Sequence, residues 1–228
     1  MGKVKIKKKE TRIDMTAMSD VTVLLLTFFM LTSTFLQKEP VQVITPPSVS
    51  EEKVPIEKLV TILVTQNGDK PQIYMELTGT ADSTLTTEDL REQALVRVGE
   101  KFGVQFTREE VDAFRKQNAF GLPISKMKEW LALPIDERDK VLQQQGAGIP
   151  IKMNFDNQNL TEFQVWIQSI YAALQEAGAE EEMDSGKGIA IKADQTTPYS
   201  VVEVIMNNLQ TIKMNKFTLM TALKTEEE

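Results

Sequence analysis

The chain has 228 residues with 26 basic and 33 acidic side chains, a formal net charge of −7, and neither cysteine nor histidine. This length suits one anchored domain of moderate size. The missing residue types exclude thiol nucleophiles, Ser-His-Asp triads and the usual zinc sites.

The charge is unevenly distributed along the chain. Residues 1–36 carry six basic and three acidic side chains, a net charge of +3, so the remainder carries −10. An acidic body argues against nucleic-acid binding. A basic segment ahead of an apolar run follows the positive-inside rule of membrane proteins. We therefore expect residues 1–14 to form a basic cytoplasmic arm and the C-terminal body to be exported.

Residues 15–36 are apolar enough to form a transmembrane helix, and Asp20 is the only charged residue among these 22. At ~1.5 Å per residue the run is ~33 Å long, enough to cross ~30 Å of hydrocarbon. A cleaved signal peptide would have a shorter apolar core and small residues at a cleavage site, whereas this run ends in STFLQKEP. We therefore expect a retained, single-pass membrane anchor.

Asp20 lies on a polar face of this predicted helix. At 100° per residue, Thr16, Asp20, Thr27 and Thr34 fall within one narrow stripe. A carboxyl group at this depth that binds and releases protons can use the membrane potential, which supplies about 2.3 kcal/mol per charge at about 100 mV. Alternatively, Asp20 is an interfacial residue that caps the helix together with Ser19. Spacing alone leaves both interpretations open.

The next segment, residues 37–57, is rich in proline and favours extended chain. At ~3.1 Å per residue such a linker could reach ~60 Å. The simplest interpretation is a spacer between the membrane helix and residues 58–228.

Residues 58–228 have the pattern of an α+β domain. LVTILV at 59–64 and PQIYMEL at 71–77 are strand-like, and the QNGD turn between them predicts a hairpin. The block at 188–223 predicts strand, loop, helix and strand. Its helix has Thr197 as a candidate N-cap and Pro198 at the first helical position. The apolar stripe of this helix consists of Val201, Val202, Ile205 and Leu209.

Residues 86–146 have the pattern of successive short helices. Thr87 with Asp89, and Thr107 with Glu110 as a capping box, are candidate helix starts. Helix-breaking residues divide the segment at Gly121, Pro123 and Pro134. We interpret this segment as a helical insertion in the domain. A further helix is expected at 160–178.

The membrane segment, IDMTAMSDVTVLLLTFFMLTSTF, resembles the ExbD/TolR family, whose pattern is Ile-Asn-x-Thr-Pro-x-x-Asp followed by an aliphatic helix. Ile13, Thr16 and Asp20 match this pattern. Asp14 stands where the family commonly has Asn, and Ala17 stands in place of the Pro. Asp20 corresponds to the proton-carrying aspartate of the family.

The resemblance covers residues 13–80 and about 160–223. It includes VQVITP, which is similar to a short extended segment of the family, and Asp194, Pro198 and Tyr199 near the C-terminus. We interpret these last three mainly as turn and cap residues.

The resemblance implies the small subunit of an inner-membrane motor that is driven by the proton-motive force and energises transport across the outer membrane. It also implies that residues 58–228 lie in the periplasm. Its implied partners are an ExbB-like polytopic protein, a TonB-like energy transducer and a second copy of the chain. We expect no enzymatic activity and no cofactor other than protons. A TolR-like role in envelope maintenance is an alternative, and so is a single-pass periplasmic binding module with no proton role.

Overall fold

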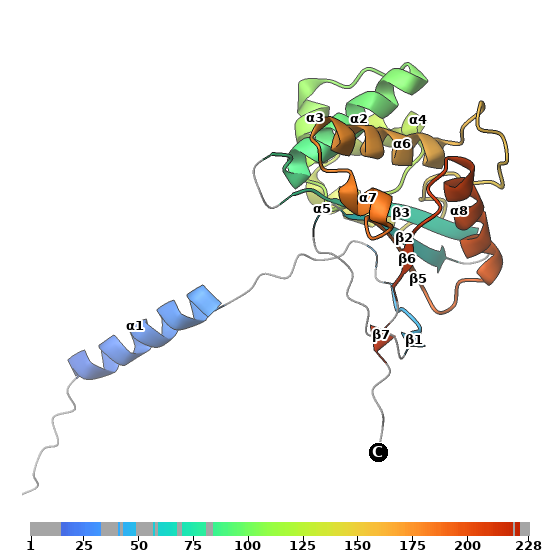
Figure 1. The fold of residues 1–228 in the computed structure, drawn as a ribbon. Helices are drawn as coiled ribbons and strands as arrows, with labels where there is room; N and C mark the ends of the chain where they lie inside the picture. The colour runs from blue at the N-terminus through green and yellow to red at the C-terminus, as the bar shows by residue number, and fades with distance from the viewer. Residues whose placement is uncertain are drawn as a thin grey trace, which may run out of the picture. The chain divides into compact units, whose positions relative to one another are not determined.

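The computed structural model describes residues 15–32, 41, 43–48, 57, 59–67, 70–80, 84–220 and 222–223. The chain divides into two compact units, Met1–Lys38 and Glu39–Glu228. The described part of the first unit is helix α1 (Met15–Thr32), and the second unit is an α+β domain (Figure 1). This agrees with the predicted fold class.

Helix α1 has the length and apolar composition of a membrane-spanning helix. It has 18 residues, none of them buried within the protein, and it spans ~27 Å at ~1.5 Å per residue. Within the described residues it is the one helix long and apolar enough to cross a bilayer. Residues 33–36, which complete the predicted span, lie outside the described residues. The apolar side chains of α1 therefore need cover from outside this unit.

The domain is built on a five-stranded mixed sheet in the order β4-β3-β2-β5-β6. The predicted hairpin is confirmed, because β2 and β3 are antiparallel and Asn67 lies opposite Lys70. Gln66 and Asn67 thus continue β2, while the rest of the predicted turn lies outside the described residues. Strand β5 runs parallel to β2, and β6 runs parallel to β5. The strands are β2 (Leu59–Asn67), β3 (Lys70–Thr78), β4 (Ala119–Phe120), β5 (Ile189–Ala193) and β6 (Thr218–Leu219).

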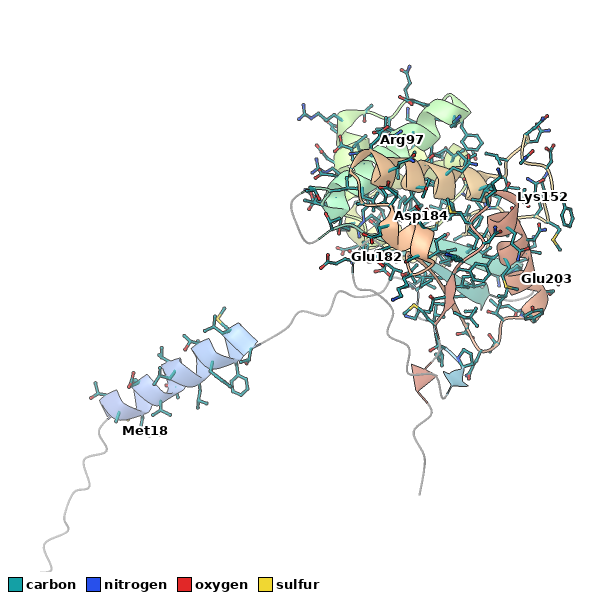
Figure 2. All side chains as sticks on the ribbon, viewed as in Figure 1. Met18, Arg97, Lys152, Glu182, Asp184 and Glu203 are labelled. Carbon is teal, nitrogen blue, oxygen red and sulfur yellow. The ribbon has the colours of Figure 1, made fainter. Side chains whose placement is uncertain are left out.

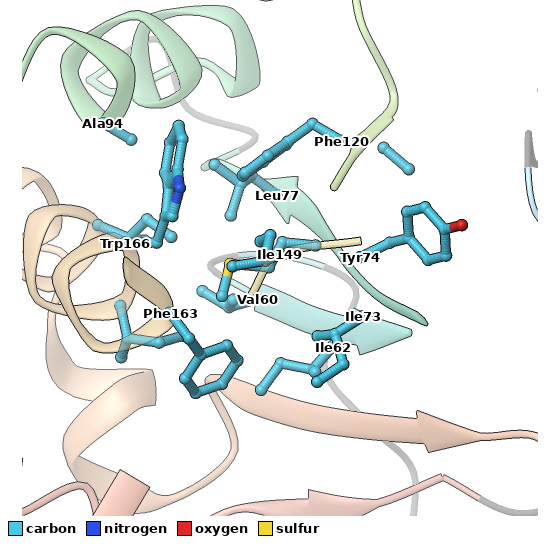
Figure 3. Packing of buried hydrophobic residues seen from close by; sticks show 14 of the residues in the cluster. Val60, Ile62, Ile73, Tyr74, Leu77, Ala94, Phe120, Ile149, Phe163 and Trp166 are labelled. Carbon is cyan, nitrogen blue, oxygen red and sulfur yellow. The ribbon is translucent and has the colours of Figure 1, made fainter. Parts of the chain in front are cut away.

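Both faces of the central hairpin are covered. Val60 and Ile62 point to the face where helices α2 (Thr87–Phe102) and α6 (Glu162–Glu176) pack, and Tyr74 points the opposite way (Figure 3). Tyr74 is fully buried, and its hydroxyl donates to the carbonyl of Leu142 at 2.6 Å. Burial raises the pKa of this phenol. Cover on both faces explains why LVTILV is almost continuously apolar.

Further short elements surround this core. The helices are α3 (Arg108–Arg115), α4 (Ile124–Leu131), α5 (Ile135–Leu142), α7 (Glu181–Ser185) and α8 (Tyr199–Thr211). Two-residue strands β1 (Pro47–Ser48) and β7 (Ala222–Leu223) form a separate parallel pair.

Of the two helix starts predicted within residues 86–146, one is confirmed and the other was wrong. The capping box of Thr107 and Glu110 is present at α3. At α2, however, the N-cap is Thr86, whose hydroxyl accepts from the amide of Asp89 at 3.2 Å. The prediction of Thr87 was wrong because an N-cap side chain bonds the third residue after it, and Asp89 is third from Thr86. The hydroxyl of Thr87 instead accepts from the amide of Gly79.

The predicted N-cap of α8 was also wrong. The cap residue is Pro198, and Thr197 makes no capping bond. The first helical residue is therefore Tyr199, and the prediction of Pro198 at that position was wrong too. The amide of Thr197 donates to the carbonyl of Asp194 at 2.9 Å, which holds this residue in the preceding turn. The predicted apolar stripe is confirmed, since Val202, Ile205 and Leu209 are buried.

The helices of residues 86–146 share one core with the sheet. Four side chains of α2 are completely buried: Leu90, Ala94, Leu95 and Val98. An aromatic cluster joins α3, β4 and α6, with ring centroids 4.9 Å apart for Phe114 and Phe120 and 4.6 Å apart for Phe120 and Trp166. Residues 86–146 therefore fold together with the sheet, and their status as an insertion relative to the family stays a prediction.

Two buried arginines fasten α3 into this core. Arg91 donates to the carbonyls of Arg115 and Leu77, at 3.0 and 3.3 Å. Arg138 donates to the carbonyl of Ala113 at 3.1 Å. Burial lowers the pKa of both guanidinium groups, although Glu76 and Glu88 oppose this effect at Arg91. The bonds to Arg115 and Ala113 satisfy carbonyls at the C-terminal end of α3 that the helix itself leaves without partners.

We predict that Leu95→Ala lowers the free energy of unfolding by about 2–5 kcal/mol, because it leaves a cavity in the core. The neighbouring Val96 is 41% exposed, so Val96→Ala is the matched control and should change the stability by less than about 0.5 kcal/mol. Urea unfolding followed by tryptophan fluorescence measures both variants. Equal effects would contradict the assignment of α2 to the common core.

Candidate functional site

The candidate site in the membrane helix is the face of α1 that carries Asp20. Asp20 is the only residue of α1 with an ionisable side chain, and it lies ~7–8 Å along the helix axis from Met15. Because α1 is helical from Met15 onwards, Asp20 and Ser19 lie inside the helix and do not cap its described start. The interfacial-cap interpretation therefore loses its geometric basis.

The threonines of α1 satisfy their own hydroxyl groups. The hydroxyl of Thr27 donates to the carbonyls of Val23 and Leu24, each at 3.0 Å. Thr22 makes the same kind of bond to Met18 and Ser19. Bonds of this kind remove the cost of placing a hydroxyl in hydrocarbon.

The predicted polar stripe is only partly described. Asp20 and Thr27, seven residues apart, lie on one side of α1 together with Thr16, whereas Thr34 lies outside the described residues. Figure 2 shows the side chains of α1 spreading in all directions, with Met18 labelled. Among the described residues of this unit, none covers Asp20. A carboxylate has no donor of its own, so Asp20 needs donors or protons from elsewhere.

Asp194, interpreted from the sequence as a turn residue, holds part of the predicted linker. One carboxylate oxygen accepts from the amide of Ile44 at 3.1 Å, and the other accepts from the amide and hydroxyl of Thr196. Partial burial raises the pKa of Asp194, but the bonds from Thr196 and Ile44 outweigh it and the net direction is downward. Asp194 therefore stays ionised at ordinary pH.

The linker residues around this contact are part of the domain. Val41 and Val43 are buried in the hydrophobic core, and the carbonyl of Ile44 accepts from the amide of Gln195 at 2.9 Å. The interpretation of VQVITP as a plain spacer was therefore wrong for these described residues. The sequence contained no signal for the contact, because Ile44 and Asp194 are 150 positions apart.

The three C-terminal residues singled out in the sequence have different surroundings. Asp194 and Pro198 are turn and cap residues, as predicted. Tyr199, in contrast, is 71% exposed, so a scaffolding role does not explain its side chain. No group of three or more metal-ligating side chains occurs within the described parts of the chain.

Comparison with known proteins assigns the chain to a family. The family model described as biopolymer transport protein ExbD/TolR matches residues 7–224. The chain belongs to the ExbD/TolR family. No curated protein and no solved structure was found to match it. The matched range confirms the resemblance inferred from the membrane segment, and it also includes residues 86–146.

Membership in the ExbD/TolR family defines the general role of the chain. It is a subunit of a motor that energises biopolymer transport, a class of proteins without enzymatic activity. Together with the apolar helix α1, membership indicates a single-pass protein of the inner membrane. The family also implies that the chain works in a complex within that membrane.

We predict that Asp194→Ala releases the segment around Ile44, because the Ile44 amide loses its carboxylate acceptor. Limited proteolysis with a nonspecific protease should then cut within residues 41–48 several-fold faster, and mass spectrometry identifies the fragments. Glu203→Ala, at an exposed position on α8, should leave the cleavage rate unchanged. Equal rates for Asp194→Ala and the wild-type chain would contradict the anchoring role of Asp194.

Proposed function

We propose that this chain is the small subunit of an inner-membrane motor driven by the proton-motive force, and that Asp20 carries the protons. The observation that supports this most strongly is the isolation of Asp20. It is the one ionisable side chain on a helix with no buried residue, in a chain that belongs to the ExbD/TolR family. Ionisable residues in membrane spans are rare, and they mark ion pathways.

The free-energy cost of exposing the charge of Asp20 to lipid supports a protein partner for this helix. A charged aspartate in a lipid-facing helix costs on the order of 2.5–3.5 kcal/mol on insertion scales. The hydroxyl of Thr27, on the same face, is already satisfied by its own backbone. A channel cannot be formed by a single span, so the Asp20 face lies against the helices of a polytopic, ExbB-like protein. Protons reach the carboxyl group through that interface.

The rest of the complex follows from the same proposal. The basic arm, residues 1–14, stays in the cytoplasm under the positive-inside rule, and the α+β domain lies in the periplasm. There the domain engages a TonB-like energy transducer that powers transport across the outer membrane. Two copies of the chain act together.

A TolR-like role in envelope maintenance is the second candidate, because the matching family model covers both ExbD and TolR. The two roles share the same proton step and differ in the process that uses the motion. Nutrient uptake and envelope integrity, measured in the same variant strains, separate them. If the chain were an anchored binding module without a proton role, neither process would depend on Asp20.

We predict that Asp20→Asn abolishes energy-dependent uptake while protein level and partner binding stay normal. Asparagine has a similar size, but its amide cannot exchange protons in the way a carboxyl group does. Thr22→Val, on the opposite side of α1, is the control and should retain uptake. Cells carrying each variant are assayed for uptake, membrane content and co-purification of the partner.

Normal uptake together with an intact envelope in the Asp20→Asn strain would contradict the proton-carrier role and favour the anchored binding module. Normal uptake together with a defective envelope would favour the TolR-like role.

We also predict that replacing residues 15–36 by poly-leucine retains membrane insertion but loses the polytopic partner. The substitution keeps an apolar span and removes Asp20 and the threonines. Pull-down in mild detergent measures the partner, with the Thr22→Val chain as the control. Retention of the partner by the poly-leucine chain would show that the polar face is not the docking surface.

A further inference from the structure

Three large hydrophobic side chains of the domain stand out from its surface. Among the described residues of the domain, the most exposed ones are Phe155, Tyr199 and Ile44, at 79%, 71% and 64%. A single exposed hydrophobic residue is ordinary on a protein surface. These three, however, are all connected to one element, helix α8.

Phe155 belongs to a loop that is bound to the C-terminal half of α8. The amide of Asn154 donates to the side-chain oxygen of Asn207 at 3.2 Å. The hydroxyl of Thr211 donates to the carbonyl of Asn154 at 2.7 Å. The residue next to Phe155 is therefore fixed to the helix from both sides of its own backbone.

The same loop is also braced internally. The side-chain amide of Asn154 donates to the carbonyls of Asp156 and Asn159, at 3.1 and 2.9 Å. These polar bonds hold the backbone, while Phe155 and Met153, which is 44% exposed, remain outside the core. A braced loop that presents an aromatic ring loses little conformational entropy when the ring is bound.

Tyr199 and Ile44 lie at the other end of α8. Tyr199 is the first residue of the helix, and the amide of Ile44 is bound to Asp194 in the turn before it. Tyr199 and Thr211 are twelve positions apart, which is ~18 Å along the helix axis. We call the exposed hydrophobic side chains at the two ends of this helix the α8 surface; they are Ile44, Met153, Phe155 and Tyr199.

The charges beside the α8 surface balance one another. Lys152 and Lys213 are basic, Asp156 and Glu203 are acidic, and all four are exposed. Figure 2 shows Lys152 and Glu203 on the same side of the domain. The chain after residue 36 carries −10 overall, so this neutral surface lacks the negative charge that anionic lipids would repel.

The linker brings the domain to the membrane at this surface. Helix α1 ends at Thr32, whereas Val41 is already part of the domain core. Because only residues 33–40 lie between them, the chain from Thr32 to Val41 spans at most ~32 Å. The linker enters the domain three residues before Ile44, a member of the α8 surface. So short a tether gives the domain a high effective concentration at the bilayer, where a weak contact suffices.

We propose that the α8 surface rests on the lipid headgroups of the membrane that α1 spans, with Phe155 and Tyr199 inserted between them. Aromatic side chains favour this interface, because it accommodates an apolar ring at the boundary of the hydrocarbon. The contact accounts for the exposure of Tyr199, and it determines which side of the domain faces the bilayer. The inference uses α1 as a membrane anchor and does not depend on the proton-carrier role of Asp20.

The full chain, reconstituted in vesicles of phosphatidylethanolamine and phosphatidylglycerol, tests this proposal through site-specific labels. Because the chain has no cysteine, Asn157→Cys allows one environment-sensitive fluorophore to be attached near Phe155. Gln105→Cys, at an exposed position between α2 and α3, gives the reference label. Brominated lipids should quench the label at position 157 several-fold more strongly than the label at position 105.

Substitutions then identify the side chains that make the contact. Combining Phe155→Ser and Tyr199→Ser in the Asn157→Cys chain should lower the quenching to the level at position 105. Phe102→Ser is the matched control, since Phe102 is 41% exposed on α2, and it should keep the quenching. Urea unfolding verifies that these exposed positions leave the fold intact. Raising the salt from about 0.1 M to about 0.5 M should not weaken an apolar contact.

Equal quenching at the two label positions would overturn the proposal, and so would quenching that persists in the double variant. A blue-shifted emission at position 157 without quenching by lipid would show that protein, such as a second copy of the chain, covers the surface instead. Loss of quenching at high salt would overturn the apolar contact in favour of electrostatic adsorption. None of these measurements depends on proton flux, so their failure is distinct from a failure of the proposed function.

Discussion

The hydrocarbon interior of a membrane offers polar groups no water, and this constraint determines how the N-terminal part of the chain is built. Helix α1 satisfies its backbone internally, and the hydroxyls of Thr22, Thr27 and Thr32 donate to carbonyls of the same helix. Asp20 is the exception, because no residue of the helix neutralises it. The helix thus needs a partner at one position, which couples its assembly to its proposed proton chemistry.

The domain is subject to a different constraint, because both faces of its sheet must be buried. Helices α2 and α6 cover one face, and the linker residues Val41 and Val43 are part of the same core. Polar groups inside this core are paired at long range, as in the bonds of Arg91 and Arg138 to backbone carbonyls. Helices of the middle segment therefore share one core with the sheet.

The sequence predicted the features that depend on neighbouring residues. The β2–β3 hairpin followed from two apolar runs around a turn, and the cap of α3 followed from the spacing of Thr107 and Glu110. The family followed from a local motif around Asp20. At α2 and α8 the helices were predicted correctly and their caps were not, because Thr86 competes with Thr87, and Asp194 draws Thr197 into a turn.

Contacts between distant residues could not be predicted in this way. The bonds of Asp194 to Ile44 and of Glu162 to Ile124 join residues 150 and 38 positions apart. Neither pair has a spacing that one sequence reveals, and the burial that shifts the pKa of Glu162 arises only after folding. For Asp20 the reverse holds. Its importance is visible in the sequence, but the helices expected to surround it belong to another protein.

The most direct test of the central claim is proton flux into vesicles that contain this chain together with its polytopic partner. Wild-type and Asp20→Asn complexes are compared at equal protein content, under the same imposed membrane potential. The proposed mechanism predicts flux in the wild-type complex and none above background in Asp20→Asn. Equal flux in the two complexes would show that protons cross without Asp20, and the proton-carrier role would have to be abandoned.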